Sequence, residues 1–244
     1  MKLKDFVQNT LIKLTGYYLQ KHEKPPENID CYITIQKLLN HYRPTVLCDV
    51  GSNNGQWAKT LAKLHPSLKE VVFFEPQSKY QAELQKVDIA NAQRKVFQLG
   101  ISNQDGNLAI KGGNASASFL AFDNNKAETF TGEVTQEEEM VAIKTLDGVY
   151  QTEQLSSPDL IKVDVQGLEL QVLQGGEGLL QKAKYVVLEL SFEEFYQGQD
   201  PLWKLMKFME EHQYRLIDFG FEWRVDYKPD NKLVQVDAIF ENIT

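Results

Sequence analysis

A glycine-containing turn directly after a short apolar run is the feature that most limits what this chain can fold into. The turn is Asp49-Val50-Gly51-Ser52-Asn53-Asn54-Gly55, and Glu75 closes the next apolar run. Residues 45–48 predict a buried strand before the turn, and the apolar spacing over 57–64 predicts a helix after it. In a doubly wound α/β fold, an acidic residue placed like Glu75 can hydrogen-bond a ribose diol. The unit therefore predicts an adenosine-type ligand at the carboxyl ends of parallel strands.

The spacing of the glycines narrows the choice of nucleotide. A dinucleotide fingerprint has a middle glycine that lets backbone approach a pyrophosphate, but Asn53 stands there, and no phosphate-binding lysine follows. A ligand with ribose and adenine but no phosphate fits, and S-adenosylmethionine is such a ligand. We expect its ribose at Glu75 and its methionine end at the turn residues Asp49, Gly51, Asn53 and Gly55, with Asp49 accepting from the ammonium. The alternative is that the two glycines only make a tight turn.

The composition excludes several classes of protein. With 244 residues, the chain suits one large α/β domain or one domain with a small extension. Its net charge of −8 gives no electrostatic basis for binding nucleic acid. Cys31 and Cys48 are the only cysteines, and Cys48 lies in a predicted buried strand, which argues against a disulfide framework. No stretch approaches the roughly 18 apolar residues of a membrane span. We expect a cytoplasmic protein without a membrane span.

Strands and helices alternate beyond residue 44. Strands are predicted at 45–50, 70–75, 95–101, 159–165 and 183–190, and helices at 55–65, 78–92, 167–182 and 200–212. This alternation predicts a parallel sheet with right-handed crossovers. Two β-rich runs, 214–224 and 233–241, are joined by a loop too short for a crossover helix, so they must pair antiparallel. The prediction is a seven-stranded mixed α/β sheet that ends in an antiparallel hairpin.

Two segments stand outside this alternation. Residues 1–42 are predicted to form an N-terminal helical cap with helices at 3–20 and 32–41, which either covers the sheet or makes a homodimer contact. A membrane-surface role is a third possibility, which the small number of basic residues disfavours. Residues 43–244 form the cofactor-binding domain. Within it, 103–146 is an insertion with strand-like runs at 107–111, 118–121 and 139–143. It is either a flexible surface loop or a cover over the carboxyl edge of the sheet, where ligands bind.

A series of short motifs follows the predicted elements in order along the chain. They are the turn at 49–55, Phe74-Glu75-Pro76, Gly100-Ile101-Ser102, Thr145-Leu146-Asp147, and the runs 159–169, 172–175 and 187–190. Together they resemble the FkbM family of S-adenosylmethionine-dependent methyltransferases over about residues 45–240. The resemblance implies a class I, Rossmann-like methyltransferase fold and, usually, O-methylation of sugars or polyketide-type natural products. Ser52 and Asn54 depart mildly from the residues common in this turn.

Methylation of a hydroxyl benefits from a base or a metal ion that takes up its proton. Asp164 and Glu189 end neighbouring predicted strands, so we expect them to meet beside the acceptor as catalytic residues. Such a pair can raise one pKa or hold a divalent cation, although the sequence offers no third oxygen ligand and we expect no metal. The alternatives are structural: Asp164 bonding the turn at 166–167, and Glu189 pairing with Lys162. Ser102, after the third strand, is expected near the adenine.

The sequence thus predicts an S-adenosylmethionine-dependent O-methyltransferase that acts on a hydroxyl of a small molecule or glycan. Two other functions remain open at this point. A nicotinamide-dependent oxidoreductase is disfavoured by the missing middle glycine and by the antiparallel hairpin. A non-catalytic cofactor-binding module is disfavoured by the intact Asp49, Glu75 and Asp164.

Overall fold

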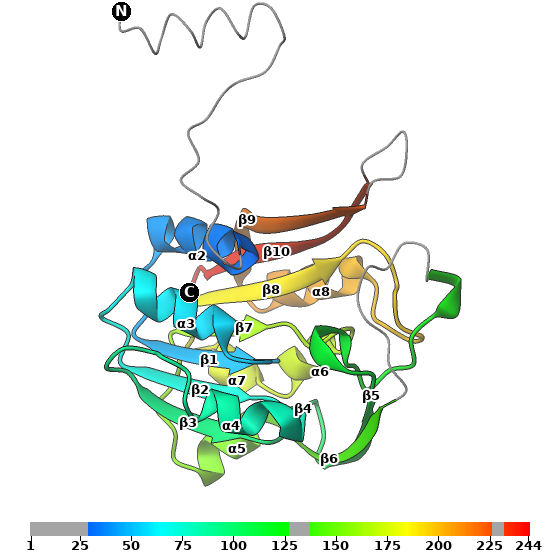
Figure 1. Ribbon diagram of the computed structural model, residues 1–244. Coiled ribbons are helices and arrows are strands. Elements are labelled where there is room, and N and C mark those ends of the chain that lie inside the picture. The colour runs from blue at the N-terminus through cyan, green and yellow to red at the C-terminus, as the bar shows by residue number, and fades with distance from the viewer. Residues whose placement is uncertain (1–28, 127–136, 226–231) are drawn as a thin grey trace, which may run out of the picture.

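A seven-stranded sheet organises the computed structural model, which describes residues 29–126, 137–225 and 232–244 (Figure 1). The strand order is β3 (Gln93–Phe97), β2 (Glu70–Phe74), β1 (Val46–Val50), β7 (Leu160–Val163), β8 (Tyr185–Ser191), β10 (Lys232–Asn242) and β9 (Tyr214–Val225). The first five strands run parallel, and β10 is antiparallel to both of its neighbours. The predicted mixed sheet with an antiparallel C-terminal hairpin is confirmed.

Helices cover both faces of the sheet, which explains why its central strands are continuous apolar runs. On one face lie α2 (Ile29–His41), which packs against β9 and α3, and α3 (Gln56–Leu64). Their fully buried side chains, such as Ile35 and Leu61, share one apolar cluster with residues of the central strands. On the other face lie α5 (Leu146–Thr152), α6 (Glu169–Gln174), α7 (Glu177–Leu180) and α8 (Leu202–Glu211). The predicted helix over 32–41 is therefore present, begins at residue 29 and packs on the sheet, whereas the one over 3–20 lies outside the described residues.

Two predicted helices are shorter than expected. The segment 78–92 holds only a 3₁₀ turn at Ser78–Tyr80 and a single helical turn, α4 (Gln81–Leu84). The segment 167–182 is divided into α6 and α7 at Gly175 and Gly176. A Cβ on Gly175 would lie 2.1 Å from the carbonyl oxygen of Ser102, so the chain must pass that backbone without a side chain. A long-range contact thus interrupts a locally helical pattern.

The predicted insertion forms a second, smaller sheet. Its strands are β4 (Gly100–Ile101), β6 (Glu138–Lys144) and β5 (Gly106–Lys111), with β6 in the middle. The predicted strand 95–101 is therefore wrong as one element, because it leaves the main sheet after Phe97. The predicted strand 118–121 is reduced to one isolated bridge between Lys111 and Ser118. Helix α5, whose first turn is capped by the Thr145 side chain accepting from the backbone N–H of Gly148, was not predicted.

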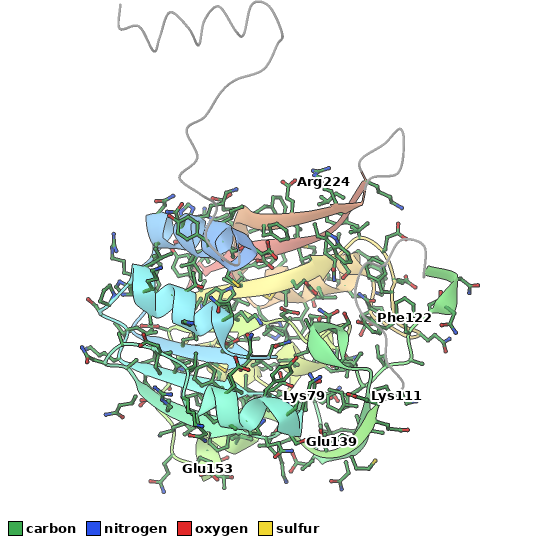
Figure 2. All side chains as sticks on the ribbon, viewed as in Figure 1. Lys79, Lys111, Phe122, Glu139, Glu153 and Arg224 are labelled. Atoms are coloured by element: carbon green, nitrogen blue, oxygen red, sulfur yellow. The ribbon has the colours of Figure 1, made fainter. Side chains whose placement is uncertain are left out.

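Side chains at the base of the small sheet attach it to the main domain. Glu139 of β6, which is labelled in Figure 2 together with Phe122, accepts hydrogen bonds from the Ser78 backbone N–H (3.0 Å) and from the Gln98 amide (3.1 Å). Earlier in the insertion, the ring of Phe122 meets Tyr196 edge-on, with centroids 6.0 Å apart. These contacts hold parts of the insertion beside the strand ends. Within the described ranges, no helix is long and apolar enough to cross a membrane.

Gly51 → Ala is expected to lower the free energy of unfolding by about 2–4 kcal/mol. Gly51 has a φ of +77°, and an added Cβ would lie 1.8 Å from the carbonyl oxygen of Asp164. Denaturant unfolding measures the change. The control is Gly106→Ala, because a Cβ at Gly106 meets nothing within 4 Å. Equal unfolding midpoints for the two variants would contradict this account of the turn.

Candidate active site

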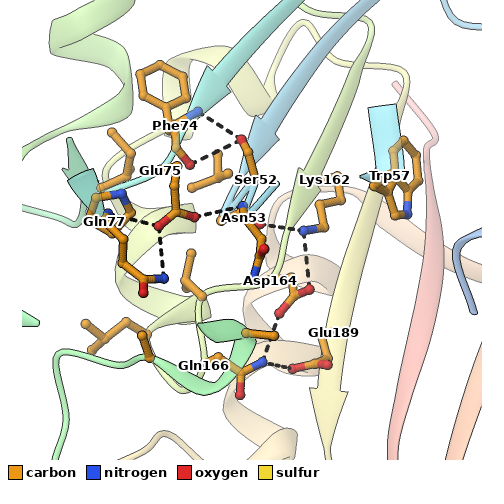
Figure 3. A pocket seen from close by; sticks show the side chains of 18 of the residues that line it. Ser52, Asn53, Trp57, Phe74, Glu75, Gln77, Lys162, Asp164, Gln166 and Glu189 are labelled. Carbon is orange, nitrogen blue, oxygen red and sulfur yellow. Dashed lines mark hydrogen bonds and ion pairs between the residues drawn. The ribbon is translucent and has the colours of Figure 1, made fainter. Parts of the chain in front are cut away.

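One cavity of about 560 Å³ opens at the carboxyl ends of the parallel strands (Figure 3). It is lined by the turn after β1, the end of β2, the ends of β7 and β8, parts of the insertion, and the hairpin of β9 and β10. A volume of this size lies within the range of small-molecule sites, roughly 300–1,000 Å³. Its place at the strand ends is where open α/β sheets bind ligands.

Glu75 lies in the wall of this cavity at the end of β2, and it is only 3% exposed. Its Oε2 accepts from the backbone N–H of Asn53 (2.8 Å), and its Oε1 accepts from the backbone N–H of Gln77 (2.9 Å). Burial raises the pKa of Glu75, against the effect of these donors. Oε1 accepts a second hydrogen bond from the side-chain amide of Gln77 (3.2 Å), whereas Oε2 has one donor. The side chain is therefore fixed in place, and Oε2 can still accept from a diol.

The turn after β1 is fixed by contacts within the chain. The Ser52 hydroxyl donates to the carbonyl of Asp49 (2.6 Å) and accepts from the backbone N–H of Phe74 (3.1 Å). Asn53 has a φ of +48° and lines the cavity together with Gly51. Gly55 does not line it: a Cβ there would lie 3.0 Å from Leu84 Cδ2. The contacts predicted between these residues and the methionine end of a cofactor stay predictions.

Asp49 and Lys162 form a buried ion pair beneath the turn. Asp49 is fully buried, does not line the cavity, and its carboxylate oxygens have no hydrogen-bond partner. Lys162 Nζ lies 3.6 Å from Asp49 Oδ1 and 3.3 Å from Asp164 Oδ2, and it donates to the carbonyl of Gly51 (2.9 Å). Burial raises the pKa of Asp49 to about 6, against the attraction of Lys162. The contact predicted between Asp49 and a ligand ammonium stays a prediction.

The structure brings Asp164 and Glu189 together, as their strand-end positions predicted. The side-chain amide of Gln166 joins them: its Nε2 donates to Asp164 Oδ1 (3.0 Å) and to Glu189 Oε2 (3.0 Å) (Figure 3). Glu189 Oε2 also accepts from Gln235 Nε2 (2.9 Å). Among the described residues, nothing donates to Glu189 Oε1. Glu189 therefore has one oxygen available beside the cavity, whereas both oxygens of Asp164 are engaged.

The alternatives considered for this pair are not what the structure shows. Lys162 lies beside Asp164 and Asp49, while Glu189 is held by two amides. The turn after β7 is stabilised by Glu169, whose Oε1 accepts from the backbone N–H of Gly167 (3.0 Å). Asp164 instead bonds a side chain that reaches into the site.

Gln166 is held by parts of the chain remote in sequence. Its Oε1 accepts from the hydroxyl of Tyr196 (3.0 Å), and its backbone carbonyl accepts from the hydroxyl of Ser118 (2.6 Å). Its own φ is +58°, a conformation that costs energy for a residue with a side chain. The insertion and the segment after β8 thus fix the amide that holds the carboxylate pair.

The acidic groups around the pair raise one another's pKa values. Burial raises the pKa of Glu189 well above its ordinary value, and the nearby charge of Asp164 raises it further. Burial also raises the pKa of Asp237 to about 7, against the effect of a hydrogen bond from Thr34. Carboxyl groups with raised pKa values in a cleft are candidates for acid–base chemistry.

Some lining residues were not found from the sequence, and one predicted residue is absent from the lining. The residues missed include Asp30, Trp57, Gln166, Phe221, Trp223, Gln235 and Asp237. Ser102 is buried but does not line the cavity, whereas its neighbours Gly100 and Ile101 do. The predicted contact of Ser102 with adenine stays a prediction. Among the described residues, no group of three or more His, Cys, Asp or Glu side chains could hold a metal ion.

Comparisons with known proteins agree with this architecture. Residues 49–216 match a family model described as the methyltransferase FkbM domain. The 2-O-methyltransferase NoeI of Sinorhizobium fredii is 28% identical over 192 residues, which is 73% of this chain and 76% of that protein. The hexuronic acid methyltransferase AglP of Haloferax volcanii is 29% identical over 159 residues, covering 64% of this chain and 58% of AglP.

A solved structure shows the same fold. Methyltransferase FkbM from Methylobacillus flagellatus superposes with a TM-score of 0.50 at 15% identity. The match covers 80% of this chain and 43% of that one, so the chain spans less than half of its length.

Proposed function

We propose that this chain, which belongs to the FkbM methyltransferase family, transfers a methyl group from S-adenosylmethionine to a hydroxyl group of a sugar. The observation that carries the proposal is a cavity at the strand ends with Glu75 in one wall and the pair of Asp164 and Glu189 in another. The relatives named 2-O-methyltransferase NoeI and hexuronic acid methyltransferase AglP support an oxygen acceptor on a sugar.

The donor and acceptor groups in the wall fit this cofactor. Glu75 Oε2 offers an acceptor for the ribose, and the turn at Gly51 and Asn53 brings backbone to the cavity without a phosphate-binding lysine. Lys162 and Asp164 form an ion pair in the wall (3.3 Å), which places both signs of charge beside the proposed position of a zwitterionic amino-acid end. When bound, the cofactor supplies a methyl group on a sulfonium, and the protein supplies position and electrostatics.

Within this proposal, Glu189 is the general base. Its free Oε1 accepts the proton of the acceptor hydroxyl, and its raised pKa makes it a stronger base than an ordinary carboxylate. Asp164 and Gln166 hold Glu189 in place, Gln166 directly and Asp164 through that shared amide. Proton removal is then a role of this chain's own residues.

Calorimetric titration tests the cofactor. S-adenosylmethionine and S-adenosylhomocysteine are each expected to bind at one site, and NAD is expected not to bind. Transfer of a labelled methyl group to a sugar then tests the reaction. Binding of NAD in place of both adenosyl compounds would favour an oxidoreductase, and cofactor binding without transfer to any sugar would contradict the proposed acceptor.

Glu75→Ala is expected to weaken the binding of S-adenosylhomocysteine by about 1.5–3 kcal/mol, the usual range for a hydrogen bond to a charged group. The reason is that Glu75 would lose the acceptors offered to the ribose. The control is Glu83→Ala, which removes an exposed carboxylate from α4. Calorimetry measures both dissociation constants. An unchanged constant in Glu75→Ala would overturn the assignment of the ribose.

A further inference from the structure

The cavity continues beyond the carboxylate pair toward the C-terminal hairpin. In the pairing of β8 with β10, Asp237 stands directly opposite Glu189, and Gln235 stands opposite Ser191. Residues directly opposite each other in an antiparallel pair share a face of the sheet. Asp237 and Gln235 therefore extend the wall that Glu189 begins, and both line the cavity.

This end of the cavity is bounded by aromatic rings. Phe221 and Trp223 of β9 line it, and the ring of Trp223 stacks on Phe195 with centroids 5.8 Å apart. Aromatic faces in a cavity offer a large, rigid, apolar contact surface. A sugar ring presents C–H groups on its faces and hydroxyls around its edge, so it can pack on such rings and hydrogen-bond at the same time.

The polar groups at this end are hydrogen-bond acceptors. Gln235 is only 6% exposed, and its Nε2 is used by Glu189 (2.9 Å) and Ser191 (3.0 Å). Its Oε1 has no hydrogen-bond partner among the described residues. Because Gln235 lines the cavity, this oxygen is available to accept from a donor on a ligand. The carboxylates of Asp237 and, nearer the start of α2, Asp30 add acceptors to the same end.

The charge of the cavity is one-sided. Its described lining contains five carboxylates, those of Asp30, Glu75, Asp164, Glu189 and Asp237, and its cationic side chain is Lys162. Lys162 already lies between two carboxylates, Asp49 and Asp164. No cation among the described lining residues is left to pair with an acidic ligand at the hairpin end.

We infer that the end of the cavity formed by Phe221, Trp223, Gln235 and Asp237 is the acceptor subsite, and that it selects a sugar unit without a negative charge. The ring packs on the aromatic side chains, and its hydroxyl or ammonium groups donate to Asp237 and to Gln235 Oε1. An acidic sugar is rejected because its carboxylate would lie among acidic side chains with no cation to pair with it. This inference rests on the proposed function and specifies the acceptor of the same site.

Saturation-transfer NMR with the protein saturated with S-adenosylhomocysteine tests the subsite. Three matched probes are used. Methyl glucoside is neutral, methyl glucosaminide carries an amine in place of one hydroxyl, and methyl glucuronide carries a carboxylate in place of the hydroxymethyl group. We expect the glucuronide to bind about tenfold more weakly than the glucoside, or worse, and the glucosaminide at least as tightly as the glucoside.

Variants assign the selectivity to this end of the cavity. The dissociation constant of the glucuronide divided by that of the glucoside measures the selectivity. Asp237→Asn is expected to reduce this ratio by about threefold or more, because it removes the repelling charge. Asp30→Asn, at an exposed position, provides a second variant with little demand on folding. The control is Glu222→Gln, which removes a carboxylate from the neighbouring strand β9 at a residue that does not line the cavity.

Three results would overturn the inference: tighter or equal binding of the glucuronide, an unchanged ratio in both Asp237→Asn and Asp30→Asn, or no binding by any of the three sugars. Calorimetry of S-adenosylhomocysteine on the same samples separates these results from a failure of the proposed function. Cofactor binding and methyl transfer with the wrong sugar preference would overturn the subsite alone. Loss of cofactor binding would count against the methyltransferase proposal itself.

Discussion

Glu189→Gln is expected to lower kcat by roughly 10²–10⁴-fold, the usual contribution of a general base. The dissociation constant of S-adenosylhomocysteine should change little, because the interaction that is lost matters mainly in the transition state. Glutamine keeps the shape of the side chain, and its Oε1 can still accept from the amides of Gln166 and Gln235, which now hold Glu189. Steady-state turnover with a sugar acceptor measures the effect.

The pH dependence separates a base from a residue that only shapes the site. Burial and the charge of Asp164 raise the pKa of Glu189 well above its ordinary value, so its carboxylate form becomes abundant only as the pH rises. The rate of the wild-type protein should therefore increase with pH through that raised value. In Glu189→Gln this increase should be absent.

Asp164→Asn provides the comparison. Its side chain bonds Gln166 and lies beside Lys162, so we expect a smaller loss of kcat and a retained increase of the rate with pH. In the double variant with both Asp164→Asn and Glu189→Gln, the loss of kcat should be smaller than the two single losses combined, because the residues act as one unit. Normal turnover of Glu189→Gln would show that positioning alone drives the reaction and that the pair is structural.

Lys162→Met is expected to destabilise the fold by about 3–5 kcal/mol, the range for breaking a buried ion pair by removing one partner. Lys162 is the neighbour that offsets the charge of Asp49, whose oxygens are fully buried without a hydrogen bond. Denaturant unfolding at neutral pH measures the loss. Lys204→Met is the control, since its pair with Asp200 is partly exposed, with 44% of the lysine side chain accessible, and exposed pairs contribute about 0–1 kcal/mol.

The loss should depend on pH in a direction set by Asp49. Its folded-state pKa is already raised from 3.8 to about 6 with Lys162 present, and removing the ammonium raises it further. A carboxyl group with a raised pKa binds more protons in the folded state than in the unfolded state, so stability falls as the pH rises. The free energy of unfolding that Lys162→Met loses relative to the wild type should therefore be larger at pH 8 than at pH 5.

A second substitution shows whether Asp49 is the cause. In the double variant with Asp49→Asn, the buried charge is gone, and part of the lost stability should return with little dependence on pH. An equal loss in Lys162→Met and Lys204→Met, or a double variant less stable than Lys162→Met alone, would show that the pair does not carry the effect.

The sequence by itself determined the fold and the edge of the sheet where the site lies. Central strands buried on both faces must be continuous apolar runs, as at Val71–Phe74, and strands separated by helical segments must lie parallel. Parallel strands end at one edge, so the positions of Glu75, Asp164 and Glu189 at strand ends were enough to predict that they meet there. These inferences need only local patterns and the geometry of a sheet.

Tertiary structure alone decided what surrounds those residues. The acceptors at Gln235 and Asp237 join the site through the register between β8 and β10, which a local pattern does not specify. The amide of Gln166 is fixed by Tyr196 and Ser118, each about 30 or more residues away. The partner of Asp49 is likewise set by packing across β1 and β7. Which polar groups meet in a buried site depends on long-range packing, and the periodicity of a sequence records only which face of an element is buried.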